Sequence, residues 1–211
     1  LIYSKSLRNR NHLLQLIREG KTNLESLEYW ERALVKHGTY IQDRRRELID
    51  WINSYQKGTV FPRQSSRKLS SLELELGLEL VYEPNIISAN RLDQYRQNEI
   101  AAGHTFTGPQ RDDVNIVAPL TTHNQRLTTL AQFGSRGKQR MAVLHLKLLE
   151  ARWIEEKTGD KPVILLDDIF SELDEEHEKM VGELIKDKQS IITATEMHQG
   201  HYPEGKVIQL I

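Results

Sequence analysis

Two adjacent carboxylates, Asp167 and Asp168, are the residues in this chain whose placement most directly suggests chemistry. They follow the apolar run 163–166, which Pro162 precedes. Such a run is typical of a strand that is buried on both faces of a parallel sheet. Carboxylates that follow it would lie at the carboxyl edge of the sheet, where α/β proteins bind ligands. One carboxylate there can hold Mg²⁺ through water and the next can orient an attacking water, whereas the alternative is a core strand that ends in a solvated turn.

The composition excludes several kinds of protein. The 211 residues include no cysteine, which rules out a disulfide framework and thiolate metal sites and fits the reducing cytoplasm. The net charge of −1 means that any nucleic-acid surface must be a local patch. No apolar run approaches the roughly 18 residues of a membrane span and no signal peptide is visible, so no membrane partner is expected.

The first hundred residues are predicted to be mainly helical. A basic helix covers about 3–18 and a long helix covers about 23–55, and the two are expected to form a hairpin. The long helix rests on apolar residues that recur every seven positions, namely Leu27, Leu34, Ile41, Leu48 and Tyr55. Gly38 inside it costs about 1 kcal/mol relative to Ala, which packing can offset. The basic side chains here favour a solvated helix face over a phosphate patch; they are Arg8, Arg10, Arg18 and those of 43–47.

A strand, a helix and a charged turn are predicted next. Alternation of apolar and acidic residues predicts a half-buried strand within 69–82, and a helix follows from Ser88 or Asn90 to about 102, where Gly103 ends it. After a break at 108–109, the cluster Arg111, Asp112 and Asp113 opens a strand over 114–117. This cluster is either a turn that satisfies its own charges or an arginine oriented by carboxylates toward a phosphate, which makes Arg111 a phosphate-contact candidate.

The segment before the Asp pair has the features of an anion-binding helix start. Gly134 is followed by Ser135 at an N-cap position, and a long helix continues to Gly159. The free N–H groups of such a start attract phosphate, and the positive charges of Arg136, Lys138 and Arg140 add to this attraction. Beyond the Asp pair, a helix over about 174–186 and strands over 190–195 and 206–211 complete the crossover pattern of a parallel sheet.

Together these segments resemble a known family. The run FGSRGKQR followed by PVILLDDIFSELD resembles the signature loop, Walker B strand and D-loop of ABC-type ATPases. With EIAAGHTFTGPQRDD and LRNRNHLL, the chain is similar to the C-terminal part of the RecF family, bacterial recombination-repair ATPases related to SMC proteins. The resemblance is close over about 92–195. It implies an α/β fold, a partial ABC-type (P-loop NTPase) core over 104–211 with an inserted mainly helical arm over 1–103.

The resemblance also implies residue roles. Asp167 would serve Mg²⁺ through water, and Asp168 would polarise the hydrolytic water. The signature loop would bind the γ-phosphate of ATP held by the other subunit of a dimer, through Ser135, Arg136, Gly137, Lys138 and Gln139. Ser171 and Asp174 would belong to the D-loop that contacts across the dimer, and Thr195 would be the switch residue. The residues that touch DNA are not indicated.

Three departures from the family pattern change the expectation for this chain. Gln110 stands where the family usually has His, and Lys138 replaces a usual Gln. No G-x-x-x-x-G-K-[ST] phosphate loop occurs in the sequence, so the chain alone is expected neither to bind nor to hydrolyse ATP efficiently. Because it starts at Leu1, we expect it to be the C-terminal portion of a longer protein.

For the intact protein, the resemblance implies ATP and Mg²⁺ as cofactors and an ATP-dependent homodimer. Its partners would be double-stranded DNA, gapped DNA junctions and RecR-like recombination mediators, and it would support recombinase loading in the bacterial cytoplasm. An alternative is a non-catalytic DNA- or protein-interaction module derived from an SMC-like ATPase. A third option is another SMC-like ATPase with a short arm, although the length of the predicted long helix favours RecF.

Overall fold

The heptad of apolar residues in the first half of the chain forms a long helix, α2 (Glu28–Gln56), in the computed structural model. α1 (Ile2–Arg18) precedes it, and a short 3₁₀ helix, η1 (Leu24–Leu27), forms where the long helix was predicted to begin. The structure describes residues 2–56, 78–119, 127–129, 136–169, 178–179, 181–182, 185–186, 188–194, 206 and 208. Contacts divide the chain into two compact units, Leu1–Asp50 with Leu80–Asn115, and Trp51–Glu79 with Ile116–Ile211. The predicted domain boundary at 103–104 stays a prediction.

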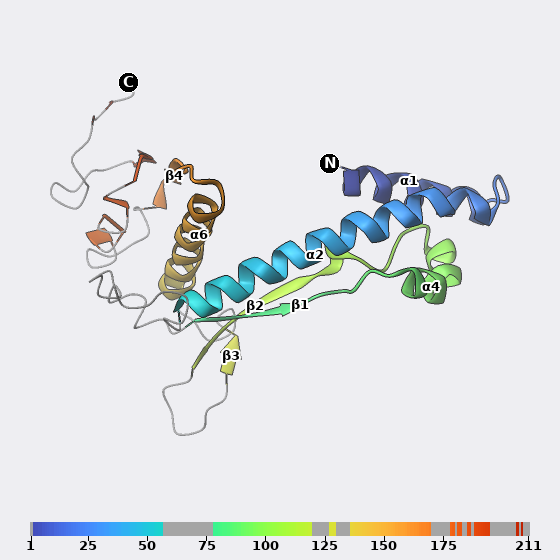
Figure 1. Ribbon diagram of the computed structural model, residues 1–211, viewed down its shortest axis with the longest axis horizontal. Helices are drawn as coiled ribbons and strands as arrows, with labels where there is room; N and C mark the ends of the chain where they lie inside the picture. The colour runs from blue at the N-terminus through green and yellow to red at the C-terminus, as the bar shows by residue number, and fades with distance from the viewer. Residues whose placement is uncertain are drawn as a thin grey trace. The chain divides into compact units, whose positions relative to one another are not determined.

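In the first unit, α1 lies beside the N-terminal part of α2, as the predicted hairpin requires (Figure 1). Tyr3 of α1, Leu34 of α2 and Ile87 form its buried cluster. Gly38 of α2 lies at this contact, where an added Cβ would be 2.8 Å from Cγ2 of Ile87 and 3.1 Å from Cε2 of Tyr3. The glycine therefore allows the close approach of α2 to its neighbours, which is the packing that offsets its low helix propensity.

The predicted helix with a Ser cap and a Gly stop is α4 (Ala89–Ala102). The Ser88 side chain accepts a hydrogen bond from the Arg91 backbone N at 3.2 Å, and Gly103 ends the helix with φ 72°. Both ends follow the usual capping chemistry, because a short polar side chain satisfies a free N–H and glycine adopts the left-handed conformation without strain.

Gly108 holds the turn that leads into the 3₁₀ helix η2 (Pro109–Arg111). Its φ is 117°, and its backbone N donates to the Asn85 carbonyl at 3.0 Å. An added Cβ would meet the Tyr3 hydroxyl and would lie 2.8 Å from Oε1 of Gln110. No other residue type fits this turn without displacing those two side chains.

We expect Gly108→Ala to lower the free energy of unfolding by about 1–3 kcal/mol, because backbone strain and a clash coincide. Gly20→Ala is the matched control, since Gly20 also has a positive φ of 71° but open space around its Cβ position. Urea unfolding followed by far-UV circular dichroism measures both. An effect of Gly108→Ala no larger than that of Gly20→Ala would contradict the packing argument.

The sheets are small within the described residues. β1 (Glu79–Glu83), β2 (Asp113–Pro119) and β3 (Leu127–Thr129) form one sheet in that order, with β2 and β3 antiparallel. β1 is the end of the strand predicted within 69–82, and its alternation holds, since Leu78 and Leu80 are buried. The earlier part of that prediction lies outside the described residues.

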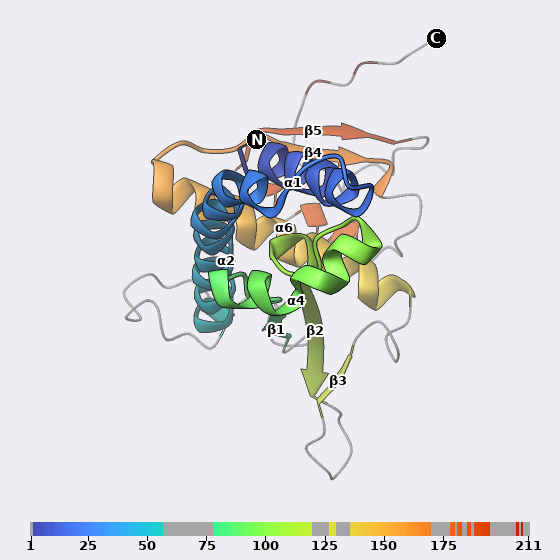
Figure 2. The same ribbon diagram turned by 90° about the vertical axis from the view of Figure 1, so that its right-hand side faces the viewer.

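The second unit contains the helix and the parallel strands predicted around the Asp pair. α6 (Arg136–Thr158) packs on one face of β4 (Ile164–Asp167) and β5 (Ser190–Thr193), which are parallel (Figure 2). The core comprises the predicted apolar side of α6, strand residues and two residues of the predicted following helix: Met141, Leu144, Leu148, Leu166, Val181 and Ile185. Of the strand predicted over 206–211, the structure describes only residues 206 and 208, so this strand stays a prediction.

The prediction that the strand at 163–166, which is β4, is buried on both faces is wrong for the described structure. Leu166 is 7% exposed, but its neighbour Leu165 is 70% exposed, and Ile191 of β5 is 59% exposed. The physical reason is that α6, Val181 and Ile185 pack on the face that carries Leu166 only. The apolar run therefore predicted the strand correctly. It did not show that, within the described structure, only one face of that strand is covered.

Within the described residues, no helix has both the length and the apolar character needed to cross a membrane.

Candidate functional site

The Asp pair lies at the carboxyl end of β4, as predicted. Asp167 is the last residue of β4, and in the parallel register it stands beside Thr193, the last residue of β5. Both carboxylates are exposed. The ends of parallel strands are where α/β sheets bind ligands, so the pair occupies the expected edge of the sheet.

Asp168 has an unusual backbone conformation. Its φ is 48°, and among the described residues it is the only non-glycine residue with a positive φ. Its backbone N donates to the Thr193 carbonyl at 3.2 Å and to Thr193 Oγ1 at 3.0 Å. Aspartate and asparagine tolerate this left-handed region better than most residues, and conformations of this kind concentrate at functional sites. The chain thus turns sharply straight after β4 and presents Asp168 at the sheet edge.

Thr193 contacts the Asp pair, and the sequence did not reveal these contacts. Its hydroxyl donates to Oδ1 of Asp167 at 2.5 Å while it accepts from the Asp168 backbone N. One side chain on β5 therefore contacts both members of the Asp pair. The parallel pairing of the two predicted strands was the available signal, but the residue that faces Asp167 depends on the register, which the sequence alone does not determine.

The start of α6 lies in the same cavity as the Asp pair. This cavity has a volume of about 900 Å³, and Arg136, Gln139, Arg140, Asp167 and Asp168 line one part of it. Gly137 and Lys138 belong to the same first turn of the helix. A helix start with two arginines suits an anion, and the carboxylates suit a cation, so the cavity wall combines the two charges that a metal-bound phosphate needs.

The rest of the cavity wall is mainly apolar. Val143 and Ile154 of α6 and Val163 and Leu165 of the strand segment line it and are exposed. Val163 and Leu165 lie on the strand face opposite to Leu166, which α6 does not cover. The cavity therefore joins a polar edge, which carries the Asp pair and the start of α6, to an open apolar surface.

The Asp pair fits Mg²⁺ by donor type. The atoms with which the pair could bind a metal ion are all carboxylate oxygens, and hard cations prefer oxygen ligands. Within the residues that were described, no group of three or more His, Cys, Asp or Glu side chains could hold a metal ion. Mg²⁺ usually binds through one or two carboxylates together with waters and substrate phosphates, and the Asp pair supplies such carboxylates.

Other predicted site residues lie outside the described residues. They are Ser135 of the signature loop, Ser171 and Asp174 of the D-loop, and Thr195. Their roles stay predictions.

The Arg111 cluster is a satisfied turn, except for the arginine itself. Asp112 accepts hydrogen bonds from Gln42 Nε2 and Arg45 Nη1, both at 2.8 Å, and from the Asn85 backbone N at 2.8 Å. Tyr82 also donates to this carboxylate. Burial opposes the ionisation of Asp112, but the hydrogen bonds from these groups outweigh it and lower its pKa. Burial, together with its contact with the Asp112 carboxylate, raises the pKa of Tyr82 to about 12.

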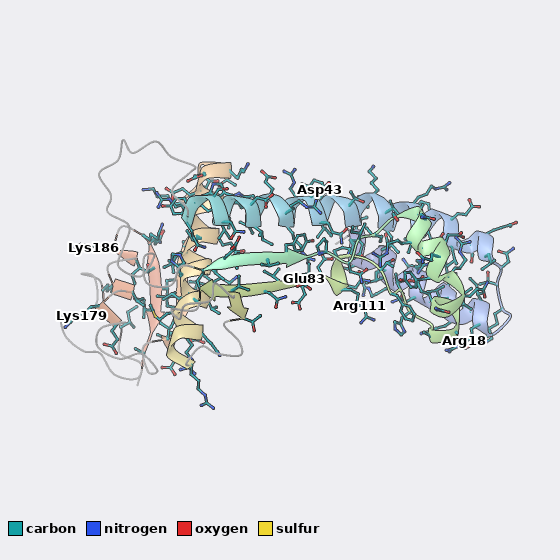
Figure 3. The ribbon with its side chains drawn as sticks, turned by 90° about the horizontal axis from the view of Figure 1, so that it is seen from below. Arg18, Asp43, Glu83, Arg111, Lys179 and Lys186 are labelled. Carbon is teal, nitrogen blue, oxygen red and sulfur yellow. The ribbon has the colours of Figure 1, made fainter. Side chains whose placement is uncertain are left out.

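Arg111 is not oriented by these carboxylates. Its side chain is exposed (Figure 3), and no residue within the described ranges accepts a hydrogen bond from it. The Asp112 carboxylate binds Arg45 instead, and Asp113 accepts from the Val114 backbone N at 2.8 Å. Arg111 therefore remains a candidate for contact with a phosphate, without the carboxylate support that was predicted for it.

The prediction of a solvated face is wrong for Arg10. Its side chain is fully buried, with Nη2 2.7 Å from Glu99 Oε2 and 3.0 Å from Glu31 Oε1. Its Nη1 donates to Thr105 Oγ1 at 2.8 Å. Arg10 thus joins α1, α2, α4 and the loop after α4 inside the first unit, and it is a structural residue. Arg8 and Arg18 are exposed, as predicted.

Curated relatives match nearly all of this chain's length. No family model matches the chain. It is 34% identical over 206 residues to "DNA replication and repair protein RecF" of Roseiflexus castenholzii, covering 92% of this chain and 50% of the relative. It is 35% identical over 225 residues to the RecF protein of Halothermothrix orenii, covering 99% of this chain and 56% of the relative. The chain thus spans about half the length of the curated relatives that it matches.

Solved structures give the same result. The structure of "the recombination mediator protein RecF-ATPrS in RecFOR pathway" matches with a TM-score of 0.67 and 27% identity, over 97% of this chain and 53% of that one. A second structure, of RecF with ATP, matches with a TM-score of 0.63 over 92% of this chain. The fold is therefore that of the matching half of an ABC-type ATPase. Along nearly all of its own length, this chain belongs to the RecF family.

Proposed function

We propose that this chain supplies the water-activating part of a RecF-like ATPase of bacterial DNA repair and recombination. The observation that carries the proposal is the Asp167–Asp168 pair at the end of β4, in one cavity with the start of α6. Family membership supports it, because the solved relatives were determined with ATP or an ATP analogue.

The proposed chemistry follows from the position of each group. Asp167 would hold Mg²⁺ through water, and the ion would neutralise charge on the β- and γ-phosphates. Asp168 would accept a hydrogen bond from the attacking water and align it for in-line attack on the γ-phosphate. The start of α6, with Ser135 before it, would stabilise the γ-phosphate of ATP held by a second subunit. Arg136, Lys138 and Gln139 would act at the same phosphate.

In the intact protein, two such subunits would close on double-stranded DNA at a gap and support recombinase loading with RecR-like partners in the cytoplasm. Ser171 and Asp174 would contact across the dimer, and Thr195 would sense the γ-phosphate. Arg111 is the proposed phosphate-contact candidate. Because the net charge is −1, DNA binding would rely on a local basic patch and would weaken steeply with salt.

ATP-dependent dimerisation tests this proposal. The chain is joined behind a RecF segment that carries a G-x-x-x-x-G-K-[ST] loop, and sedimentation velocity is measured with and without ATP and Mg²⁺. We expect the joined protein to shift from monomer to dimer on addition of ATP. The control is the same protein with the phosphate-loop lysine replaced by alanine, which we expect to stay monomeric.

If the joined protein binds ATP but does not dimerise, the result would contradict the proposed ATP-dependent clamp. The non-catalytic interaction module would then be the better description.

A further inference from the structure

We propose that Thr193 is the positioning residue of this site, which fixes the Asp167 carboxylate for a hydrated divalent cation and holds the Asp168 backbone in its turn. The inference rests on the proposed function in one respect, that Asp167 serves Mg²⁺. Thr193 is the last residue of β5, and the role proposed for it is separate from the role predicted for the switch residue Thr195.

The hydrogen bonds of Thr193 leave its hydroxyl a single orientation. The Asp168 backbone N donates to Oγ1 at 3.0 Å, so a lone pair of the hydroxyl is occupied on that side. The one hydroxyl proton is then directed to Oδ1 of Asp167 at 2.5 Å. A threonine hydroxyl has one proton and two lone pairs, so these two bonds determine its direction.

The contact selects which oxygen of Asp167 faces a ligand. Oδ1 is engaged by Thr193, and among the described residues no group donates to Oδ2. Oδ2 is therefore the oxygen available to a hydrated cation. Partners of this kind fix the orientation of a ligating carboxylate, and their removal typically lowers metal affinity by about 10–100-fold.

The same hydroxyl links the two carboxylates through the backbone. Asp168 departs from β4 with φ 48°, and its backbone N is held by both Oγ1 and the carbonyl of Thr193. Replacing Thr193 by valine keeps the β-branched shape and the carbonyl contact but removes the hydroxyl. Thr193→Val therefore isolates the orienting contact from the strand pairing of β4 with β5.

Manganese binding to the full 211-residue chain tests the inference without ATP hydrolysis. MnCl₂ is titrated into ¹⁵N-labelled protein, and paramagnetic broadening of the Asp168 amide signal gives the affinity. We expect Thr193→Val to weaken binding by about tenfold and Thr193→Ser, which keeps a hydroxyl, to restore most of it. Ser190→Ala removes a hydroxyl from the other end of β5 and should leave the broadening unchanged.

The outcomes separate this inference from the proposed function. If Asp167→Asn abolishes the broadening but Thr193→Val binds Mn²⁺ as tightly as the unchanged chain, the role of Thr193 is overturned and the metal site stands. If Asp167→Asn does not weaken binding, or if the unchanged chain shows no broadening, the metal site itself is overturned together with the inference. Melting curves of all variants identify any loss of fold.

Discussion

Asp168→Asn in the joined, ATP-competent protein should lower the rate of ATP hydrolysis by about 10²–10⁴-fold while ATP binding and the ATP-dependent dimer persist. The reason is chemical, because an amide oxygen is a much weaker acceptor for the proton of the attacking water than a carboxylate. The measurement is phosphate release under single-turnover conditions, alongside nucleotide affinity.

Asparagine is the appropriate substitution because of the backbone. Asp168 has φ 48°, a conformation that asparagine adopts as readily as aspartate and that alanine adopts only with strain. Asp168→Asn therefore removes the charge and keeps the turn, whereas Asp168→Ala would change both. Asp160→Asn is the control, since Asp160 is an exposed acid in the same unit, between α6 and β4. Hydrolysis by Asp168→Asn within about twofold of the unchanged protein would exclude Asp168 from the chemistry.

The sequence predicted the elements of the site well. Serine at the start and glycine at the end predicted the bounds of α4 and α6 to within a residue or two, and the apolar run predicted β4. These signals work because they act within a few neighbouring residues. The sequence did not reveal Thr193, because its partner is determined by the register between strands that are far apart in the chain. The burial of β4 was overestimated for a related reason. An apolar residue shows that a strand face is suited to burial, but it does not show whether another element packs on that face.

Arg10 shows the same limit in the helical unit. Its neighbours in sequence are basic and polar, so a solvated face was the natural interpretation. Its partners Glu31 and Glu99 are acidic residues on two other helices, and nothing in the local pattern connects them. Long-range ion pairs of this kind can be identified only from the tertiary structure. A buried charge on a helix is therefore easily mistaken for a solvated one when only the sequence is known.

The second large effect is expected from this buried network. Arg10→Met should lower the free energy of unfolding by about 3–5 kcal/mol, because it leaves the fully buried Glu99 carboxylate without its cation. Methionine has a long, flexible side chain that fills much of the space left by arginine, so the loss of stability reflects the missing charge more than a cavity. Urea unfolding gives the total effect, and hydrogen exchange measured by mass spectrometry over α1 and α4 localises it to the first unit. Arg18→Met, an exposed arginine on the same helix, should change stability by about 0.5 kcal/mol or less.

A second substitution separates an unpaired charge from a general packing defect. Glu99 Oε1 accepts a hydrogen bond from the Phe106 backbone N at 2.6 Å, and a glutamine at this position can keep that acceptor while it removes the charge. The double variant Arg10→Met with Glu99→Gln should therefore recover a substantial part of the loss, since removing both partners of a buried pair costs much less than removing one. If the double variant is as unstable as the sum of the two single variants, the charges do not interact as the geometry implies. Recovery would mean that the arginine in the LRNRN segment is retained to neutralise the acids that join the three helices.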